Sequence, residues 1–341
     1  MLKQQKIFFD FLRFCIGSVK EIPDSLKEAD WKELYAIAKK QALLGVLFHG
    51  IQRLPKELAP EQKLLMQWMV MAEMIRKQNI KLFQDSVKVC QNFENEGFAN
   101  CILKGQGNAL LYPDPYMRTP GDIDIYLSGG RKKILKYVDR VCPNQVMRYH
   151  HVDFPVMKTA IEVHFTPSYM FYPIHNRRMQ KWFEEVMGEQ CNHRVSLPDG
   201  YGKIHVPKVS FNVIYILSHL YRHIFTEGIG LRQLLDYYYV LISDDLLLIR
   251  DRVQKELKHL GLWKFAQAVM FVMKEVFGLS EDRMIAPMDE KEGRFLLDEI
   301  MRGGNFGQYD DRMGSKVGES KIHRYFRMNP VSYTHLTLPT S

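Results

Sequence analysis

The chain of 341 residues has the composition of a globular protein, with 46% hydrophobic and 25% charged residues. This balance excludes disordered and collagen-like classes, and the length predicts about two domains, or one domain with large helical additions. The 47 Lys and Arg residues outnumber the 39 Asp and Glu residues by 8, and between residues 128 and 194 they number 11 against 6. An anionic partner near this middle region is therefore favoured over general nucleic-acid binding.

Cysteine usage and hydropathy indicate the compartment. The five cysteines are odd in number and widely spaced, at Cys15, Cys90, Cys101, Cys142 and Cys191. This pattern is typical of reduced thiols, so we expect a cytoplasmic protein. No uncharged apolar run of the sequence reaches the roughly 18 residues that a membrane span requires, and a charge at position 10 interrupts the apolar N-terminal stretch. We therefore expect neither a membrane segment nor a signal peptide.

Helices are predicted throughout the first region, residues 1–97. The clearest case is residues 61–95, where apolar side chains such as Leu64, Trp68 and Met71 recur at helical spacing. We interpret this stripe of methionine and aromatic residues as core packing.

After Gly97 the pattern changes to that of a small α/β core, residues 98–208. Apolar runs, period-2 alternation and glycine or proline breaks predict a strand, a short helix, a strand, a helix and two strands, at residues 98–103, 108–112, 121–127, 131–141, 151–157 and 160–165. From Pro173 to about residue 209 we expect irregular structure, with a hairpin turn at Pro198-Asp199-Gly200.

The C-terminal region, residues 209–328, is predicted to be helical again, at residues 211–225, 231–242, 244–260, 262–277 and 290–302. The last residues, 331–341, resemble translated read-through of a sequencing adapter. We expect this tail to be non-native and the natural chain to continue past about Pro330. The predicted fold class is thus α+β, with a small mixed sheet flanked by helical regions.

An acidic pair is the sharpest chemical signal. Asp122 and Asp124 lie two residues apart on a predicted strand, so both carboxylates project from one face. Like charges so close are costly unless a cation neutralises them, and carboxylate oxygens suit Mg²⁺. Glu162 has the alternation to bring a third carboxylate to that face, and Asp153, also flanked by apolar residues, is its rival for this role. Three carboxylates are able to hold two metal ions. The alternative interpretation is a solvated strand face.

A glycine turn precedes the pair. Gly105 lies between a predicted strand and a short helix, where backbone N–H groups can bind phosphate. Lys104 and Arg118 are placed to add positive charge.

With these residues the sequence resembles the nucleotidyltransferase superfamily of polymerase-beta-like fold, and within it the bacterial group known as nucleotidyltransferase family proteins. The resemblance covers residues 98–241. The matching segments are Leu103-Lys104-Gly105, Arg118, Asp122-Ile123-Asp124 and Ile161-Glu162-Val163-His164. Two features depart from the superfamily pattern: Gln106 stands where Ser or Gly is usual, and fifteen residues separate Gln106 from Asp122.

The resemblance implies an enzyme that transfers a nucleoside monophosphate from an NTP, ATP being favoured, to a hydroxyl acceptor. One or two Mg²⁺ ions would be bound by Asp122, Asp124 and Glu162, which are also the catalytic residues. The nucleotide would be bound by Lys104, Gly105, Gln106 and Arg118. Residues 228–236 look like the helical element that follows the core in this family, so substrate contacts are predicted for His164, Arg232 and Asp236. A structural role for His164 is the alternative.

Three rival motifs point to other chemistry. Residues 105–110 read Gly-x-Gly-x-x-Leu, similar to a dinucleotide-binding turn, but the third glycine is missing. The Asp-x-Asp pair is also typical of metal-dependent glycosyltransferases, where it follows an apolar strand. His219 and His223 have the spacing of a zinc half-site, although no clear third ligand accompanies them, so we interpret them as core or pocket residues.

Two functions from different classes follow. The first is a Mg²⁺-dependent nucleotidyltransferase, and the second is a degenerate member of that fold that binds a nucleotide or a protein without turnover, for which Gln106 is the sequence support. Nucleic-acid binding is a weaker third hypothesis, and the acceptor is left open.

Overall fold

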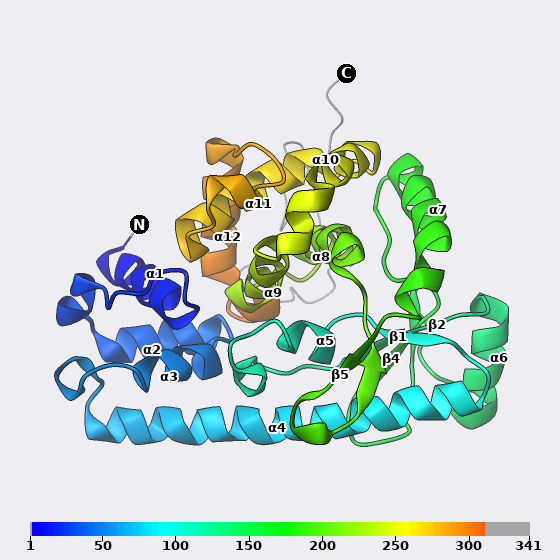
Figure 1. The fold of residues 1–341 in the computed structure, drawn as a ribbon, viewed down its shortest axis with the longest axis horizontal. Helices are drawn as coiled ribbons and strands as arrows, with labels where there is room; N and C mark the ends of the chain where they lie inside the picture. The colour runs from blue at the N-terminus through cyan, green and yellow to red at the C-terminus, as the bar shows by residue number, and fades with distance from the viewer. Residues whose placement is uncertain (1, 311–341) are drawn as a thin grey trace, which may run out of the picture. The chain divides into compact units, whose positions relative to one another are not determined.

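The computed structural model describes residues 2–310, so the predicted tail at residues 331–341 lies outside the described residues. Figure 1 labels the helices and strands along the chain. The chain divides into two units. We call Met1–Ala72 with Ile216–Ser341 the helical unit, and Glu73–Tyr215 the sheet unit. The fold class is α+β, as the sequence predicts.

Helices make up the described part of the helical unit. The α-helices are α1 (Lys3–Cys15), α2 (Trp31–Lys40), α3 (Leu44–Ile51), α9 (Leu231–Leu241), α10 (Asp244–His259), α11 (Trp263–Phe277) and α12 (Glu290–Gly303). Short 3-10 turns lie at η1 (Asp24–Glu28), η2 (Lys56–Leu58), η5 (Glu281–Arg283) and η6 (Asn305–Gly307). Gly293 allows the close packing of α12 on α11, because a Cβ there would lie 2.3 Å from the Cβ of Phe271.

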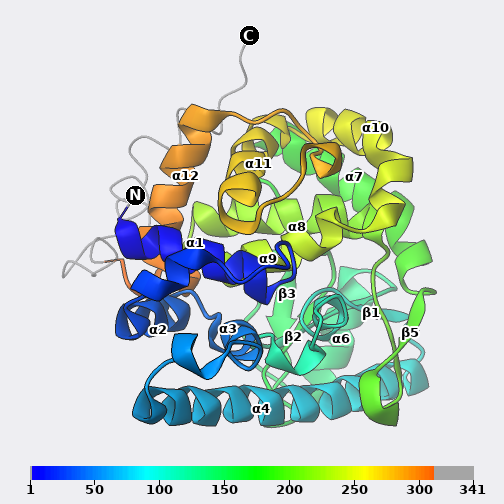
Figure 2. The same ribbon diagram turned by 60° about the vertical axis from the view of Figure 1, so that its left-hand side comes forward.

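Two helices continue from one unit into the other. Helix α4 (Gln62–Asn95) is a single helix of 34 residues, and α8 (Val209–Ile224) has 16. Figure 2 shows α4 as one unbroken helix. The apolar periodicity over residues 61–95 therefore predicts its length well.

The sheet unit contains a four-stranded mixed sheet in the order β1-β2-β4-β3. Strands β2 and β4 are parallel, and the β1–β2 and β3–β4 pairs are antiparallel. The elements in chain order are β1 (Asn100–Ile102), α5 (Gln106–Ala109), η3 (Pro115–Met117), β2 (Ile123–Leu127), α6 (Arg131–Val141), β3 (His151–Asp153), β4 (Ile161–His164) and α7 (Pro173–Gln190). A two-stranded hairpin, β5 (Arg194–Ser196) and β6 (Lys203–His205), follows, with η4 (Pro198–Gly200) at its turn.

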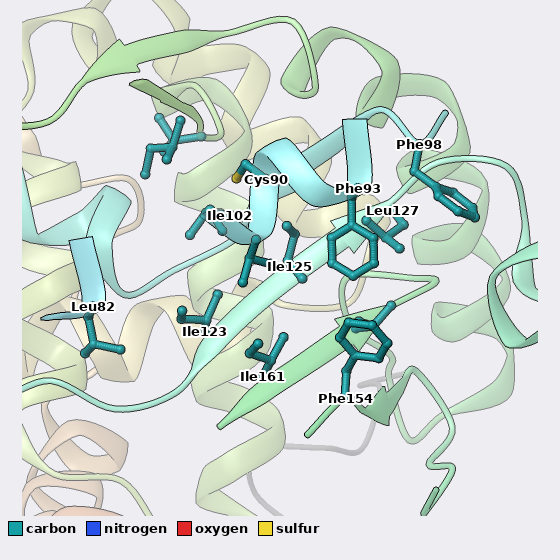
Figure 3. Packing of buried hydrophobic residues seen from close by; sticks show 14 of the residues in the cluster. Leu82, Cys90, Phe93, Phe98, Ile102, Ile123, Ile125, Leu127, Phe154 and Ile161 are labelled. Atoms are coloured by element: carbon teal, nitrogen blue, oxygen red, sulfur yellow. The ribbon is translucent and has the colours of Figure 1, made fainter. Parts of the chain in front are cut away.

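One face of the sheet is apolar and packs in the core of this unit. Ile123, Ile125 and Leu127 alternate along β2 and are fully buried. They belong to one cluster with Phe93 of α4 and Ile161 of β4 (Figure 3). Because strand side chains alternate between faces, this packing leaves the intervening polar residues on the opposite face.

The element predictions are confirmed for α6, for the four sheet strands and for the turn at Pro198–Gly200. β3 ends at Asp153, earlier than predicted. The predicted irregular structure after Pro173 is wrong, because α7 occupies Pro173–Gln190. Proline is well suited to the first turn of a helix, and Met179, Phe183 and Met187 then recur on one buried face. Pro173 thus begins a helix instead of marking the end of regular structure.

Among residues 2–310, no helix is both long enough and hydrophobic enough to span a membrane.

Candidate active site

Strand register gathers acids and histidines on the polar face of the sheet. Asp124 of β2 lies opposite Glu162 of β4, and Glu162 lies opposite Asp153 of β3. His151 of β3 lies opposite His164 of β4 in the same way. Asp122 immediately precedes β2, and His150 immediately precedes β3. We call this set the carboxylate–histidine cluster: Asp122, Asp124, His150, His151, Asp153, Glu162 and His164.

Asp124 is the most tightly held member of the cluster. Its side chain is 3% exposed, with Lys104 Nζ 3.1 Å from Oδ2 and His164 Nε2 3.0 Å from Oδ1. Burial alone would raise the pKa of Asp124, but the Lys104 charge and the His164 hydrogen bond hold it below its usual range. Asp124 is therefore an ionised carboxylate inside the protein.

Asp122 experiences the charge of that carboxylate. The negative charge of Asp124, followed by burial, raises the pKa of Asp122 to about 6. The Glu162 charge acts in the same direction, whereas Lys104 opposes it. The two aspartates are thus close enough for each to penalise ionisation of the other, as the sequence predicts for one strand face.

Glu162 lies between two imidazole rings. Its Oε2 is 3.1 Å from His151 Nδ1 and 3.6 Å from His164 Nε2. Burial raises the pKa of Glu162, but the hydrogen bond with His164 and the charges of His151 and His164 together lower it below its usual value. For His164, burial lowers the pKa, and the bonds to Asp124 and Glu162 raise it above the usual value. Burial lowers the pKa of His151 to about 4, so this ring is neutral at neutral pH.

The glycine turn lies beside the acidic pair. Gly105 has φ 59° and ψ −109°, a conformation that glycine adopts readily. A Cβ at Gly105 would lie 3.5 Å from the carbonyl oxygen of Asp122, and the Leu103 amide donates to the Asp124 carbonyl at 2.9 Å. The Gln106 side chain is buried, and its Oε1 accepts from Ser86 Oγ of α4 at 3.4 Å. Since α5 has only four residues, its dipole contributes little to anion binding.

The loop that leads into Asp122 is attached to α4 by one amide. Asn79 Nδ2 donates to the backbone carbonyls of Tyr116 and Arg118, each at 2.8 Å. Arg118 is buried, so its predicted positive charge is inside this unit. In the sequence, Asn79 is visible only as a polar interruption of an apolar stripe.

Arg232 and Asp236 belong to α9 in the helical unit, where both are buried. The Arg232 guanidinium packs over the ring of Phe306, 5.6 Å from its centroid. Their predicted part in substrate binding stays a prediction.

The sequence analysis did not identify His150 and His151. Three groups of residues in the described part of the chain can hold a metal ion: His150 with His151 and His164; Asp124 with Glu162 and His164; and His151 with Asp153 and Glu162. A His-His pair just before a predicted strand was the available signal. Asp153 and Glu162, the two rivals for the third acid, both lie on the polar face of the sheet.

The sheet unit thus combines an acidic pair, a third acid on the parallel neighbouring strand and an adjacent glycine turn. Residues 27–278 match the model of the family described as uncharacterised nucleotidyltransferase. The chain belongs to this family. The match extends beyond the residues that carry the resemblance in the sequence, into helices on both sides of the core. Neither the curated proteins nor the solved structures include a match to this chain.

Proposed function

We propose that this chain is a Mg²⁺-dependent nucleotidyltransferase that transfers a nucleoside monophosphate from an NTP to a hydroxyl acceptor. The observation that carries the proposal is the parallel register of Asp124 and Glu162, with Asp122 beside them. Family membership supports the transfer of a nucleotidyl group in general.

The acidic residues fit a divalent cation. Asp122 resists ionisation because of the Asp124 charge, and a cation beside both carboxylates relieves that repulsion. Asp122, Asp124 and Glu162 would hold one or two Mg²⁺ ions through oxygen donors. A Mg²⁺ ion bound there would neutralise the negative charge that develops on the phosphates during transfer.

The chain's own groups have separate parts in the reaction. Glu162 accepts the proton of the acceptor hydroxyl, whose oxygen bonds to the α-phosphorus while the bond to the β-phosphate breaks and pyrophosphate leaves. Lys104 and Arg118, with the backbone at Gly105 and Gln106, bind the phosphates. His164 orients Asp124 through the 3.0 Å contact of Nε2 with Oδ1.

ATP is the donor we propose, and the cytoplasm is the proposed location, consistent with five free cysteine thiols. Arg232 and Asp236 are proposed to contact the substrate.

Transfer of label from α-labelled ATP tests the proposal. The protein is incubated with MgCl₂ and with separate small-molecule, RNA and protein fractions of a bacterial extract as acceptors. We expect incorporation by the wild type and by Asp139→Asn, an exposed acid of α6 that serves as control. We expect loss of about 1,000-fold in the Asp122→Asn, Asp124→Asn double variant. Equal incorporation by all three proteins would refute the proposal.

The second candidate is a nucleotide-binding module without turnover. The observation that favours it is Gln106, whose side chain is committed to Ser86 of α4 and is buried. Calorimetry decides between the two functions. ATP binding that does not depend on Mg²⁺, with no pyrophosphate release, would favour the module.

A further inference from the structure

The histidine side of the cluster contains a closely spaced series of ligand atoms. His150 Nε2 is 3.2 Å from His151 Nδ1, and His151 Nδ1 is 3.1 Å from Glu162 Oε2. The series continues from Glu162 Oε2 to His164 Nε2 at 3.6 Å, and from there to Asp124 Oδ1 at 3.0 Å. Neighbouring ligands around a metal with bonds of about 2.1 Å are about 3.0–3.4 Å apart. The spacing is therefore that of a coordination shell.

These donors are enclosed by protein. His150, His151 and His164 are 2%, 5% and 1% exposed. The ring of Tyr169 packs against His150 with 5.3 Å between centroids, and His150 packs against His164 at 5.2 Å. An enclosing shell of this kind limits solvent access to a metal and orients its ligands.

His151 Nδ1 has two neighbours within hydrogen-bond distance and at most one proton to share between them. His151 Nδ1 faces both His150 Nε2 and Glu162 Oε2, and a ring nitrogen with one proton cannot accept from the first while donating to the second. Two other ring nitrogens, His151 Nε2 and His164 Nδ1, are buried and have no hydrogen-bond partner among residues 2–310. If a metal ion is bound, these two nitrogens are free to carry the ring protons, and the lone pairs of His151 Nδ1 and His164 Nε2 are then available to the ion.

The donor chemistry selects the cation. Imidazole nitrogen suits Zn²⁺ and other first-row transition metals, whereas Mg²⁺ takes oxygen ligands and retains water. Three imidazoles and one carboxylate are a common donor set for Zn²⁺.

We propose that His150, His151, His164 and Glu162 bind one divalent transition-metal ion of the zinc class, at a site that adjoins the proposed Mg²⁺ site of Asp122, Asp124 and Glu162. The two sites share Glu162. Binding at the histidine site does not depend on the proposed function, because it requires neither nucleotide nor acceptor.

Metal titration without nucleotide tests the site. Co²⁺ is added to the metal-free full chain and its visible absorption is recorded, and Zn²⁺ is then used to displace it. We expect the intense bands of nitrogen-ligated Co²⁺, one equivalent of Zn²⁺ per chain, and no displacement by Mg²⁺ at comparable concentrations.

Matched variants locate the ion. The His150→Asn, His151→Gln double variant should bind Zn²⁺ about 100-fold more weakly, whereas the His219→Asn, His223→Gln variant should bind as the wild type does. If the first variant fails to fold by circular dichroism, His151→Gln alone is titrated in the same way. Equal Zn²⁺ affinity of the wild type and the folded cluster variant would overturn the proposal, as would displacement of Co²⁺ by Mg²⁺. Nucleotidyl transfer measured with Mg²⁺ is scored separately, so failure of either proposal leaves the other intact.

Discussion

Each unit of the molecule contains a group of neighbouring histidines, and the two groups have different electrostatic surroundings. In the helical unit, His219 and His223 lie one turn apart on α8, with ring centroids 4.2 Å apart. In the sheet unit, His150, His151 and His164 come from two strands and the residue before one of them. Only the first group has a metal-ligand spacing in the sequence.

The charges beside the two groups differ. Arg222 Nη2 lies 3.2 Å from His219 Nδ1 and 3.1 Å from His223 Nε2, so both rings accept from a permanently charged guanidinium. The sheet group lies against Glu162 and the buried Asp124, whereas the acid beside His223 is the largely exposed Glu227, 3.2 Å away. Within residues 2–310, every group able to hold a metal belongs to the carboxylate–histidine cluster. Helical spacing of two histidines therefore does not by itself make a metal site.

The two histidine groups should differ most in how far the free energy of unfolding falls when a neighbouring acid is removed. Asp124→Ala removes the buried carboxylate that pairs with the half-buried Lys104 and the buried His164, so the free energy of unfolding should fall by about 3–5 kcal/mol. Glu227→Ala removes a largely exposed partner of His223 and should cost less than about 1 kcal/mol. Urea unfolding of both variants measures this, and equal losses would contradict the comparison.

Asp122, a second acid of the cluster, should lower the free energy of unfolding at neutral pH when it is ionised. Because the pKa of Asp122 is raised to about 6 in the folded state, the folded chain binds more protons than the unfolded chain between about pH 4 and pH 6. The stability associated with this group is present below pH 4 and is lost as the pH rises through 6. Asp122→Asn should therefore raise the free energy of unfolding at pH 7 by about 1–3 kcal/mol, and under the proposed function it should abolish transfer.

The measurement for Asp122→Asn is thermal or urea unfolding from pH 3.5 to pH 8, with Asp139→Asn as the exposed control. The advantage of the variant should disappear below pH 4. An advantage of equal size at every pH would exclude the electrostatic explanation.

The turn beside the cluster has a positive φ at Gly105, whereas the histidines of α8 lie in a regular helix. Gly105→Ala places a side chain at φ 59° and should cost about 1–2 kcal/mol, with a loss of transfer as the turn moves away from Asp122. Gly121→Ala is the matched control, because a Cβ there meets no atom within 4 Å. Equal melting temperatures for the two variants would show that the conformation of Gly105 is unimportant.

The smallest expected effect tests the role of Arg222. Arg222→Gln removes the positive charge between His219 and His223 and should strengthen Zn²⁺ binding by that pair about tenfold. The titration is made in the His150→Asn, His151→Gln background, so that the cluster does not contribute. Unchanged affinity would mean that charge is not what separates the two groups.

The strand pattern and the acids could be predicted because they are local. Alternation around Asp122 and around Glu162 is visible in a few residues, and the family resemblance selects Glu162 as the third acid. The structure adds that its rival Asp153 lies opposite Glu162 on the next strand. Both residues therefore belong to the polar face, which local patterns could not reveal.

The part of His150 and His151 in the cluster could not be predicted because it depends on strand pairing. His151 meets His164 only through the antiparallel register of β3 and β4, and a single sequence does not determine that register. Helix α7 was not predicted for another reason. Its buried residues are separated by charged ones, and its first residue is a proline. The role of Asn79 depends on where a loop passes α4, which is likewise not local.

The two helices that belong to both units limit how the molecule can be dissected. One boundary falls at Ala72 within α4, and the other falls at Tyr215 within α8. A fragment cut at either boundary would end in the middle of a helix and would leave its hydrogen-bonded turns unfinished. The sheet unit therefore cannot be expressed alone without cutting a helix. A minimal fragment that contains the cluster and both complete helices would run from Gln62 to Ile224.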